Sequence, residues 1–414
     1  DRLETAIIRS QRFSKMFALL FIDLDRFKQV NDSLGHLIGD EILRMVGQRL
    51  GNNVRQVDTV ARLGGDEFII ILDNIEKIRD VSIIAEDIIK DVSTVYLVDN
   101  KEVSIGASIG ISIYPTNGKD AETLLSQSDI AMYQAKQTGR NRHHFFTEEV
   151  DAASKGRMQF EQDLRLALDK EQFELYYQPV VDDKHQKLVS AEALIRWLHP
   201  TDGLILPDDF IPLAEETGVI FELSRWVLDA VCKQLAIWEQ SNQPLCTIAI
   251  NLPSAEHLCG FTKHYVKKIT DQYQVSPSRL IFEITEGLMM ENTEKSILWL
   301  NSLRDLGVHI SIDDFGIGYS SLSYLKRYPV DSLKIDRSFI KNIVSDNHNQ
   351  LLVDTFVSIA NSMQLELVAE GVETLEQMKY LQEHQSNCHL IQGDFYSKPL
   401  AIADFEHFRD TFNT

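Results

Sequence analysis

The sequence predicts an α/β protein with two domains, a central sheet flanked by helices followed by a β/α barrel. The chain has 414 residues. A single domain usually holds roughly 100–200 residues, so two cores are expected. Apolar runs of strand length alternate with amphipathic helical stretches, which is typical of a sheet covered by helices. In the second half, eight strand-like runs follow one another, as in a closed β/α barrel.

The first domain is expected to cover residues 1–147. Strands are predicted at residues 16–25, 59–63, 67–72 and 103–115, and helices at residues 1–15, 41–54, 84–95 and 121–137. The second and third of these strands meet at Gly64 and Gly65, which supply the positive φ angles of a tight hairpin.

A connecting helix is predicted at residues 148–172, where apolar side chains recur at helical spacing without a Gly/Ser tether. The second domain is expected at residues 173–414. Its eight strands are predicted at residues 173–181, 188–197, 247–252, 280–285, 309–315, 332–336, 365–371 and 389–396.

Composition and charge exclude two classes of protein. The formal net charge of −21 argues against a partner that is a nucleic-acid polymer, because such binding needs a basic surface. The longest apolar runs, residues 18–22 and 68–72, are far shorter than the ~20 residues that span a bilayer. The cysteines lack metal-ligand spacing and are expected to be buried small side chains in a reducing cytosol: Cys232, Cys246, Cys259 and Cys388.

Carboxylates recur at the ends of apolar strand runs in the second domain. They are Glu192, Glu283, Glu286, Asp313, Asp314 and Glu370. In a parallel barrel all strand C-termini point to one rim, so these acids should converge. Their mutual repulsion is tolerable only if cations neutralise them, which predicts a metal-assisted phosphoester site.

The residue types suggest separate roles in this site. Three carboxylates and one amide are the oxygen ligands predicted for a first cation: Glu192, Asn251, Glu283 and Asp313. Asp314 follows Asp313 directly and is suited to a second cation. Lys334 can position the attacking water or offset charge growing on the phosphate. Glu370 is the candidate general base or a further ligand of the second cation.

A second candidate site lies in the first domain. Asp23 and Asp25 interrupt the end of an otherwise core-like strand, where an ionised carboxylate is costly unless a cation or hydrogen-bond donors meet it. Pairing Asp23 with Asp66 of the hairpin would hold Mg²⁺ and leave positions open for substrate phosphates.

Three motifs of the first domain resemble the GGDEF family of diguanylate cyclases. They are FIDLDRFKQVNDSLGHLIGD at residues 21–40, ARLGGDEF at 61–68 and AMYQAKQTGRNR at 131–142. The resemblance implies a domain that condenses two GTP into cyclic di-GMP with two Mg²⁺ or Mn²⁺ ions. Since each domain holds one GTP, it also implies a homodimer.

The same resemblance implies roles for individual residues. Metal ligation falls to Asp23, Asp66 and the Leu24 carbonyl, catalysis to Glu67, guanine recognition to Asn31 and Asp40, and phosphate contacts to Lys136 and Arg140. Arg55 and Asp58 match the family's RxxD product-inhibition motif, which precedes the glycine pair here.

Eight motifs between residues 173 and 399 resemble the EAL family of cyclic di-GMP phosphodiesterases. They are QPVV, EALIRW, NLPS, FEITE, DDFGIGYSSL, LKIDRSFI, VAEGVET and QGDFYSKP. The resemblance implies hydrolysis of cyclic di-GMP to pGpG by two-metal catalysis, with substrate or supporting contacts from Gln178, Arg196, Asp336 and Gln392. It also has Glu286 steady the DDFGIGYSS loop, which Gly316 and Gly318 make mobile.

The leading hypothesis is therefore a bifunctional module that turns over cyclic di-GMP. The alternative is a protein in which one domain, the first being the better candidate, only binds nucleotide and regulates the other. A third hypothesis, an unrelated barrel phosphotriesterase, would require histidine-rich metal ligands that the strand ends lack. Because the chain opens without a start methionine or signal peptide, we expect a cytoplasmic fragment of a larger bacterial protein, for which a membrane anchor outside this fragment is one option.

Overall fold

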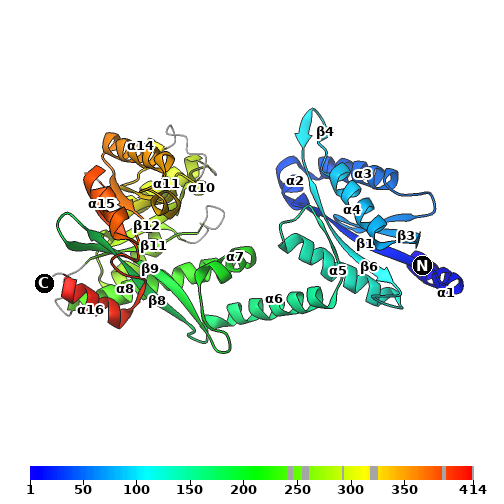
Figure 1. Cartoon of the computed structure of the whole chain (residues 1–414), viewed down its shortest axis with the longest axis horizontal. Helices are drawn as coiled ribbons and strands as arrows, with labels where there is room; N and C mark the ends of the chain where they lie inside the picture. Colours follow the sequence, from blue (N-terminus) through cyan, green and yellow to red (C-terminus); the bar gives the residue numbers. More distant parts are fainter. Residues whose placement is uncertain (241–245, 254–260, 291–292, 318–324, 385–387, 413–414) are drawn as a thin grey trace. The chain divides into compact units, whose positions relative to one another are not determined.

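The computed structural model describes residues 1–240, 246–253, 261–290, 293–317, 325–384 and 388–412. The chain divides into two compact units, Asp1–Glu161 and Gln162–Thr414 (Figure 1). Helix α6, Glu148–Ala167, crosses this division.

Cys259 and Gly318 lie outside the described residues. The other three cysteines are buried and unpaired, as the sequence predicts. Within the described residues, no helix combines the length and hydropathy needed to cross a bilayer.

The first unit is a five-stranded sheet in the order β2-β3-β1-β6-β7. Its strands are β1 Met16–Asp25, β2 Thr59–Gly64, β3 Glu67–Ile75, β6 Gly106–Tyr114 and β7 His143–Phe145, with a separate hairpin of β4 Tyr96–Val98 and β5 Lys101–Val103. Its helices are α1 Arg2–Phe13, α2 Phe27–Leu34, α3 His36–Asn52, α4 Ile78–Val92 and α5 Ala121–Gln137. Helix α2 and the hairpin β4–β5 were not among the predicted elements.

The central strand β1 explains how both faces of this sheet are covered. Successive side chains of a strand point to opposite faces. Leu20 and Ile22 join the core beneath α3 and α4. Leu19 and Phe21 join the core with α1 and α5. Because both faces are buried, the strand is apolar throughout until the acids at its end.

The second unit is a closed eight-stranded barrel, as the sequence predicts. Its strands are β8 Phe173–Asp182, β9 Lys187–His199, β11 Thr247–Asn251, β12 Leu280–Thr285, β13 His309–Phe315, β14 Ser332–Ile335, β15 Glu366–Ala369 and β16 Leu390–Gln392. The short strands β10 Gly203–Ile205 and β17 Leu400–Ala401 extend the sheet.

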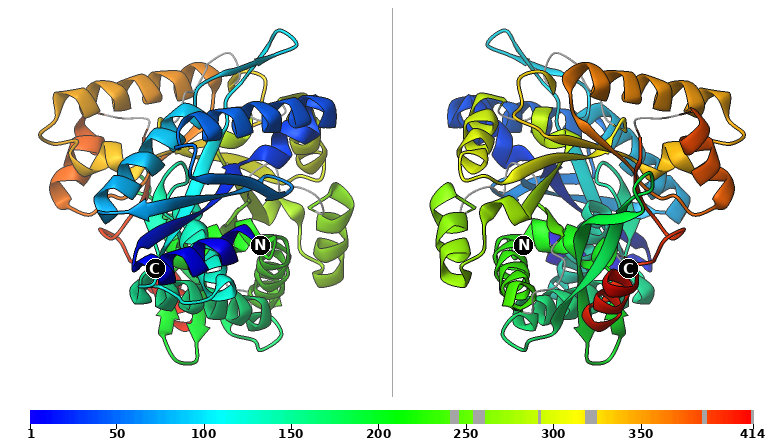
Figure 2. Two further views of the ribbon diagram at one scale, coloured as in Figure 1. Left: turned by 90° about the vertical axis from the view of Figure 1, so that its right-hand side faces the viewer. Right: turned by 90° about the vertical axis from the view of Figure 1, so that its left-hand side faces the viewer.

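Helices lie on the outside of the barrel (Figure 2). They are α7 Pro207–Thr217, α8 Ile220–Gln240, α9 Lys263–Tyr273, α10 Glu286–Met290, α11 Thr293–Arg304, α13 Arg337–Lys341, α14 Asn347–Met363, α15 Leu375–His384 and α16 Ile402–Phe412. Helix α8 shows why: Leu223, Val227, Val231 and Leu235 recur every four residues and are buried.

One strand departs from the parallel barrel that the sequence predicts. Strand β8 runs antiparallel to both of its neighbours, β9 and β16, and closes the barrel between them. A short connection, residues 183–186, joins β8 to β9, and so short a link permits only a hairpin. The other seven strands are parallel, so their C-terminal ends share one rim.

Candidate active sites

The barrel brings the predicted acids together at this rim, although Glu192 lies in the middle of β9 and Glu283 lies two residues before the end of β12. Asn251 is the last residue of β11 and stands beside Glu283 of β12 in the parallel register. Glu283 is 3% exposed, and Glu192 on β9 is 6% exposed. Asn251 Nδ2 donates to Glu192 Oε1 at 2.5 Å. The acids therefore lie inside the barrel mouth rather than on its outer surface.

Lys334 stands at the centre of these acids and is 2% exposed. Its Nζ lies 3.0 Å from Glu192 Oε2, 2.9 Å from Glu283 Oε1, 3.3 Å from Asp313 Oδ1 and 2.5 Å from Glu370 Oε1. Burial acts to lower the pKa of Lys334, but the surrounding carboxylates hold that pKa well above its usual value. Lys334 is therefore a charged ammonium group in contact with four carboxylates.

Burial and mutual repulsion raise the pKa values of three of the acids. Burial, with repulsion from Glu192, raises the pKa of Glu283 well above its usual value. Burial raises the pKa of Glu370 to about 8, although Lys334 opposes that shift. Burial and the adjacent Asp313 raise the pKa of Asp314 to about 6. One lysine therefore does not offset the cost of ionising all of these buried acids together.

This oxygen set fits divalent cations. Ligand atoms of Glu192, Glu283 and Asp313 lie within 4.8 Å of one another, and so do those of Asp313, Asp314 and Glu370. The two groups share Asp313. Glu283 Oε2 is buried and accepts no hydrogen bond within the described part of the chain. A buried carboxylate oxygen without a donor is well placed to bind a cation.

We expect the stability of the metal-free protein to fall between about pH 5 and pH 8. The folded-state pKa values of Asp314, about 6, and Glu370, about 8, exceed those of the unfolded chain. The folded state therefore binds more protons over this interval, and its extra stability is lost as pH rises through the folded values. Thermal unfolding of chelator-treated protein at several pH values measures the slope. Glu370→Gln should reduce that slope, and equal slopes in both proteins would contradict the assignment.

The residues predicted to support the site surround this cluster. Gln392 Nε2 donates to Glu192 Oε2 at 2.7 Å and to Gln178 Oε1 at 3.2 Å. Glu286 is 4% exposed, and its Oε2 accepts the Gly316 N–H at 3.1 Å, which ties it to the start of the DDFGIGYSS loop. The rest of that loop, from residue 318, lies outside the described residues.

Two further predicted residues make structural contacts. The Asp336 carboxylate accepts from the Ser338 N–H and caps α13. Arg196 on β9 is buried, donates to the Ile195 carbonyl at 3.0 Å and lies over the Tyr176 ring at 5.3 Å. These contacts hold both side chains in fixed positions.

A pocket of about 570 Å³ adjoins the acid cluster, and sequence reasoning missed it. It lies between β9 and helices α7 and α8, and Asn251, Asp313 and Asp314 form one side of it. Pro207, Ile211 and other apolar side chains form much of the remainder. The proline-led helix start at residue 207 was visible in the sequence, but its place beside the acids was not.

In the first unit, β1 and the hairpin bring a smaller set of predicted residues together. Asp23 is paired with Glu67 across β1 and β3, and Asp66 lies in the adjoining turn. Lys136 Nζ lies 2.7 Å from Asp23 Oδ2. Burial raises the pKa of Asp23 despite Lys136, and Asp66 adds to the rise by repulsion. Leu24, whose carbonyl is a predicted ligand, is buried beside them.

The predicted nucleotide contacts of the first unit are more open. Asn31 lies against Gly39, where any Cβ atom would overlap the Asn31 Oδ1 atom. Asp40 and Arg140 are exposed, and Arg140 has a left-handed backbone with φ of 54°. The sequence did not assign a role to Asp25, which accepts from Ser108 Oγ at 2.7 Å and from the Asn141 N–H at 3.0 Å. Asp25 thereby holds the turn that follows Arg140.

The two residues that match the RxxD motif differ in their surroundings: Asp58 forms hydrogen bonds within the fold, and the Arg55 side chain lies on the surface. Asp58 Oδ2 accepts from the Arg55 N–H and Oδ1 from the Asp73 N–H, each at 2.9 Å. The Arg55 side chain is exposed. Asp58 therefore shapes the turn, while the Arg55 guanidinium is available to a ligand.

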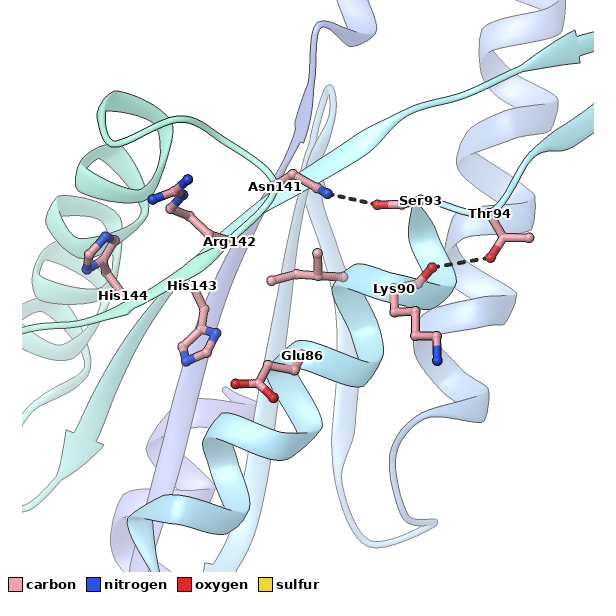
Figure 3. A pocket seen from close by; sticks show the side chains of 9 residues that line it. Glu86, Lys90, Ser93, Thr94, Asn141, Arg142, His143 and His144 are labelled. Atoms are coloured by element: carbon pink, nitrogen blue, oxygen red, sulfur yellow. Dashed lines mark hydrogen bonds between the residues drawn. The ribbon is translucent and has the colours of Figure 1, made fainter.

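A separate hollow of about 690 Å³ lies between α4 and the segment leading into β7 (Figure 3). It contains none of the predicted site residues. Asn141 Oδ1 accepts from Ser93 Oγ at 2.8 Å across it, and His143 Nε2 lies 2.9 Å from Ser82 Oγ. Burial lowers the pKa of His143 and His144, so both imidazoles tend to be neutral. The charged side chains that line this hollow are therefore Lys90, Arg142 and Glu86.

Comparison with known proteins gives matches for both halves of the chain. The family model described as diguanylate cyclase, GGDEF domain, matches residues 1–142, and the EAL domain model matches residues 161–399. The bifunctional diguanylate cyclase/cyclic di-GMP phosphodiesterase MucR of Pseudomonas aeruginosa is 42% identical over 97% of this chain and 58% of its own length. The cyclic di-GMP phosphodiesterase NbdA of the same organism is 38% identical over 95% of this chain and 50% of its own. The chain thus spans between half and three fifths of these relatives.

A solved structure of the PaMucR phosphodiesterase in complex with c-di-GMP is similar to the second unit. It is 39% identical in sequence, with a TM-score of 0.57, and covers 60% of this chain and 99% of the solved chain.

Proposed function

The chain belongs to the EAL family and carries a GGDEF domain ahead of its EAL domain, and from this we propose that it turns over cyclic di-GMP. The barrel hydrolyses cyclic di-GMP to linear pGpG, and the first unit condenses two GTP into cyclic di-GMP. One observation carries the proposal: Glu192, Glu283, Asp313 and Glu370 converge on the buried Lys334 at the barrel rim.

Two divalent cations, Mg²⁺ or Mn²⁺, fit the two overlapping oxygen groups of the barrel. Glu192, Asn251, Glu283 and Asp313 would hold one, and Asp313 and Asp314 the other, with Glu370 as a further ligand or the base. Bound there, the cations would supply Lewis-acid chemistry to phosphoester hydrolysis.

The side chains of this site have separate tasks in hydrolysis. Glu370, which lies at the rim beside Asp313 and Asp314, is suited to take a proton from the attacking water. Lys334, buried among these acids, would help to offset the negative charge that the phosphate gains. The apolar pocket of about 570 Å³ beside Asp313 has room for a guanine base.

Synthesis requires the acids of the first unit. Asp23 and Asp66, with the Leu24 carbonyl, would hold cations beside Glu67. Lys136 would then give up its ion pair with Asp23 and contact the GTP phosphates instead. Two GTP-loaded copies must meet, so we propose a homodimer as the synthetic form. Synthesis should accordingly rise with protein concentration.

A second candidate function has its own support. Within the described residues, two groups of three acids could hold a metal ion, and both groups lie in the barrel. In the first unit, Asp23 is instead paired with Lys136. This favours a protein whose first unit binds GTP and regulates hydrolysis without synthesis. GTP would then change the hydrolysis rate without yielding product.

Incubation with each nucleotide separates these functions. The protein is given GTP or cyclic di-GMP, with Mg²⁺ or Mn²⁺, and products are resolved by chromatography. Conversion of cyclic di-GMP to pGpG is expected, and its absence would contradict the main proposal. Cyclic di-GMP formed from GTP supports synthesis. A GTP effect on hydrolysis without such product supports regulation.

We expect Arg55→Ala to relieve product inhibition of synthesis and leave hydrolysis unchanged. The exposed guanidinium would bind a phosphate of cyclic di-GMP, and alanine removes that charge without disturbing the Arg55 N–H bond to Asp58. Initial synthesis rates are measured against added cyclic di-GMP. Arg79→Ala, at an exposed position of α4, is the matched control. Equal inhibition in wild type and Arg55→Ala would refute the role of Arg55.

A further inference from the structure

Beneath the acids of the barrel rim, several inward-facing side chains on one side of the barrel are small. Residues two positions apart in a strand point to the same face. Glu192, Asp313 and Lys334 therefore each share an inward face with a serine two residues earlier in the same strand, further from the rim. These serines are Ser190, Ser311 and Ser332. We call these three serines the serine floor. On the other side of the barrel the same layer is apolar, with Val180, Val368 and Leu390 packed together.

The serine floor leaves a cavity beneath the acids. It has a volume of about 230 Å³, and its walls include all three serines, Ala249 and the side chains of Glu283 and Lys334. In most such barrels this layer is filled by bulky branched side chains. A polar cavity of this size has room for several waters, each occupying roughly 30 Å³. Lys334 thus borders the acid cluster above and a polar cavity below.

The position of Lys334 creates a competition for oxygen atoms. Its ammonium group contacts the four carboxylates of Glu192, Glu283, Asp313 and Glu370. Three of these, Glu192, Glu283 and Asp313, form one of the two cation-binding groups, and Glu370 belongs to the other. An ammonium group and divalent cations repel one another and share these oxygens, so both cannot keep their best contacts.

We propose that Lys334 is a built-in counter-ion that holds the metal-free acids together, and that entering divalent cations displace its ammonium group toward the serine floor. The inference rests on the metal site of the proposed function. The hydroxyls of Ser190, Ser311 and Ser332 are acceptors for the displaced N–H groups. The cavity is then a reserved space that lets the same lysine serve both the empty and the loaded site.

Two substitutions test the two halves of this idea. Lys334→Met removes the counter-ion, so the metal-free protein should unfold at a lower temperature, because buried carboxylates lose their partner. Its Mn²⁺ affinity should rise, since no ammonium group competes. Ser332→Val removes one hydroxyl and fills the cavity with an apolar group. It should keep the stability of the metal-free protein and weaken Mn²⁺ binding about tenfold, within the range for residues of one ionic network.

The decisive result is the double variant. If Ser332→Val weakens binding only by blocking the displaced ammonium group, it should have little effect in the Lys334→Met background. Val368→Ile is the matched control, because it fills the same cavity on its apolar side. Mn²⁺ affinity is measured by calorimetry on the full chain without nucleotide, after chelation. All proteins carry Asp66→Ala, so that binding in the first unit is removed.

The outcomes separate this inference from the proposed function. A parent protein that binds no Mn²⁺ would refute both. Binding that Ser332→Val weakens equally with and without Lys334 would refute the inference alone. If Lys334→Met folds only when Mn²⁺ is added, the counter-ion role is supported. If it does not fold at all, the comparison of Ser332→Val with Val368→Ile decides, and equal affinities would overturn the proposal.

Discussion

Replacing Glu192 by alanine is expected to lower hydrolysis of cyclic di-GMP by about a thousandfold or more. The Glu192 carboxylate accepts hydrogen bonds from three side chains, Asn251, Lys334 and Gln392, at 2.5, 3.0 and 2.7 Å. Alanine removes a cation ligand and leaves these three groups without their common acceptor. Loss of cation chemistry is worth several kcal/mol, and each 1.36 kcal/mol is about tenfold in rate.

The measurement is the initial rate of pGpG formation in saturating Mg²⁺ or Mn²⁺. Glu376→Gln, at an exposed position in the first turn of α15, is the matched control and should keep wild-type turnover. Circular dichroism of both variants excludes a folding defect. If Glu192→Ala retained more than a few per cent of wild-type activity, the barrel rim would not be the hydrolytic site.

The second large effect is expected from Asp66→Asn, which should abolish synthesis of cyclic di-GMP and leave hydrolysis intact. Asp66 lies in the turn between β2 and β3 and is close enough to Asp23 to raise its pKa by repulsion. The amide keeps the size of the side chain but removes the negative charge that a second oxygen ligand supplies. Phosphoryl transfer depends on cations that neutralise developing charge, so the loss should exceed about a hundredfold.

Synthesis from GTP and hydrolysis of added cyclic di-GMP are measured on the same preparation. Asp80→Asn, exposed in the first turn of α4, is the control. A wild-type protein that makes no product under any condition would favour regulation by bound GTP, and Asp66→Asn should then abolish the GTP effect on hydrolysis. An Asp66→Asn protein with normal synthesis would exclude the hairpin from the cyclase site.

The sequence alone determined the two folds and which residues could gather at the barrel rim. Apolar runs interrupted by acids at their ends predict strands whose last side chains face a common rim, because a strand fixes its side-chain direction through local geometry. Glu192, Glu283 and Asp313 do converge on parallel strands, although Glu192 and Glu283 lie inside their strands rather than at the last position. Their individual roles in binding cations remain predictions of the proposed function.

The tertiary structure decided what local patterns do not encode. The contact of Lys334 with four carboxylates and the cavity bordered by the serine floor each depend on strands far apart in sequence. A serine two residues before an acid predicts only a shared face. Whether that space is filled depends on the side chains from the other strands, and whether a lysine is solvated or ion-paired depends on which acids the closed barrel brings to it.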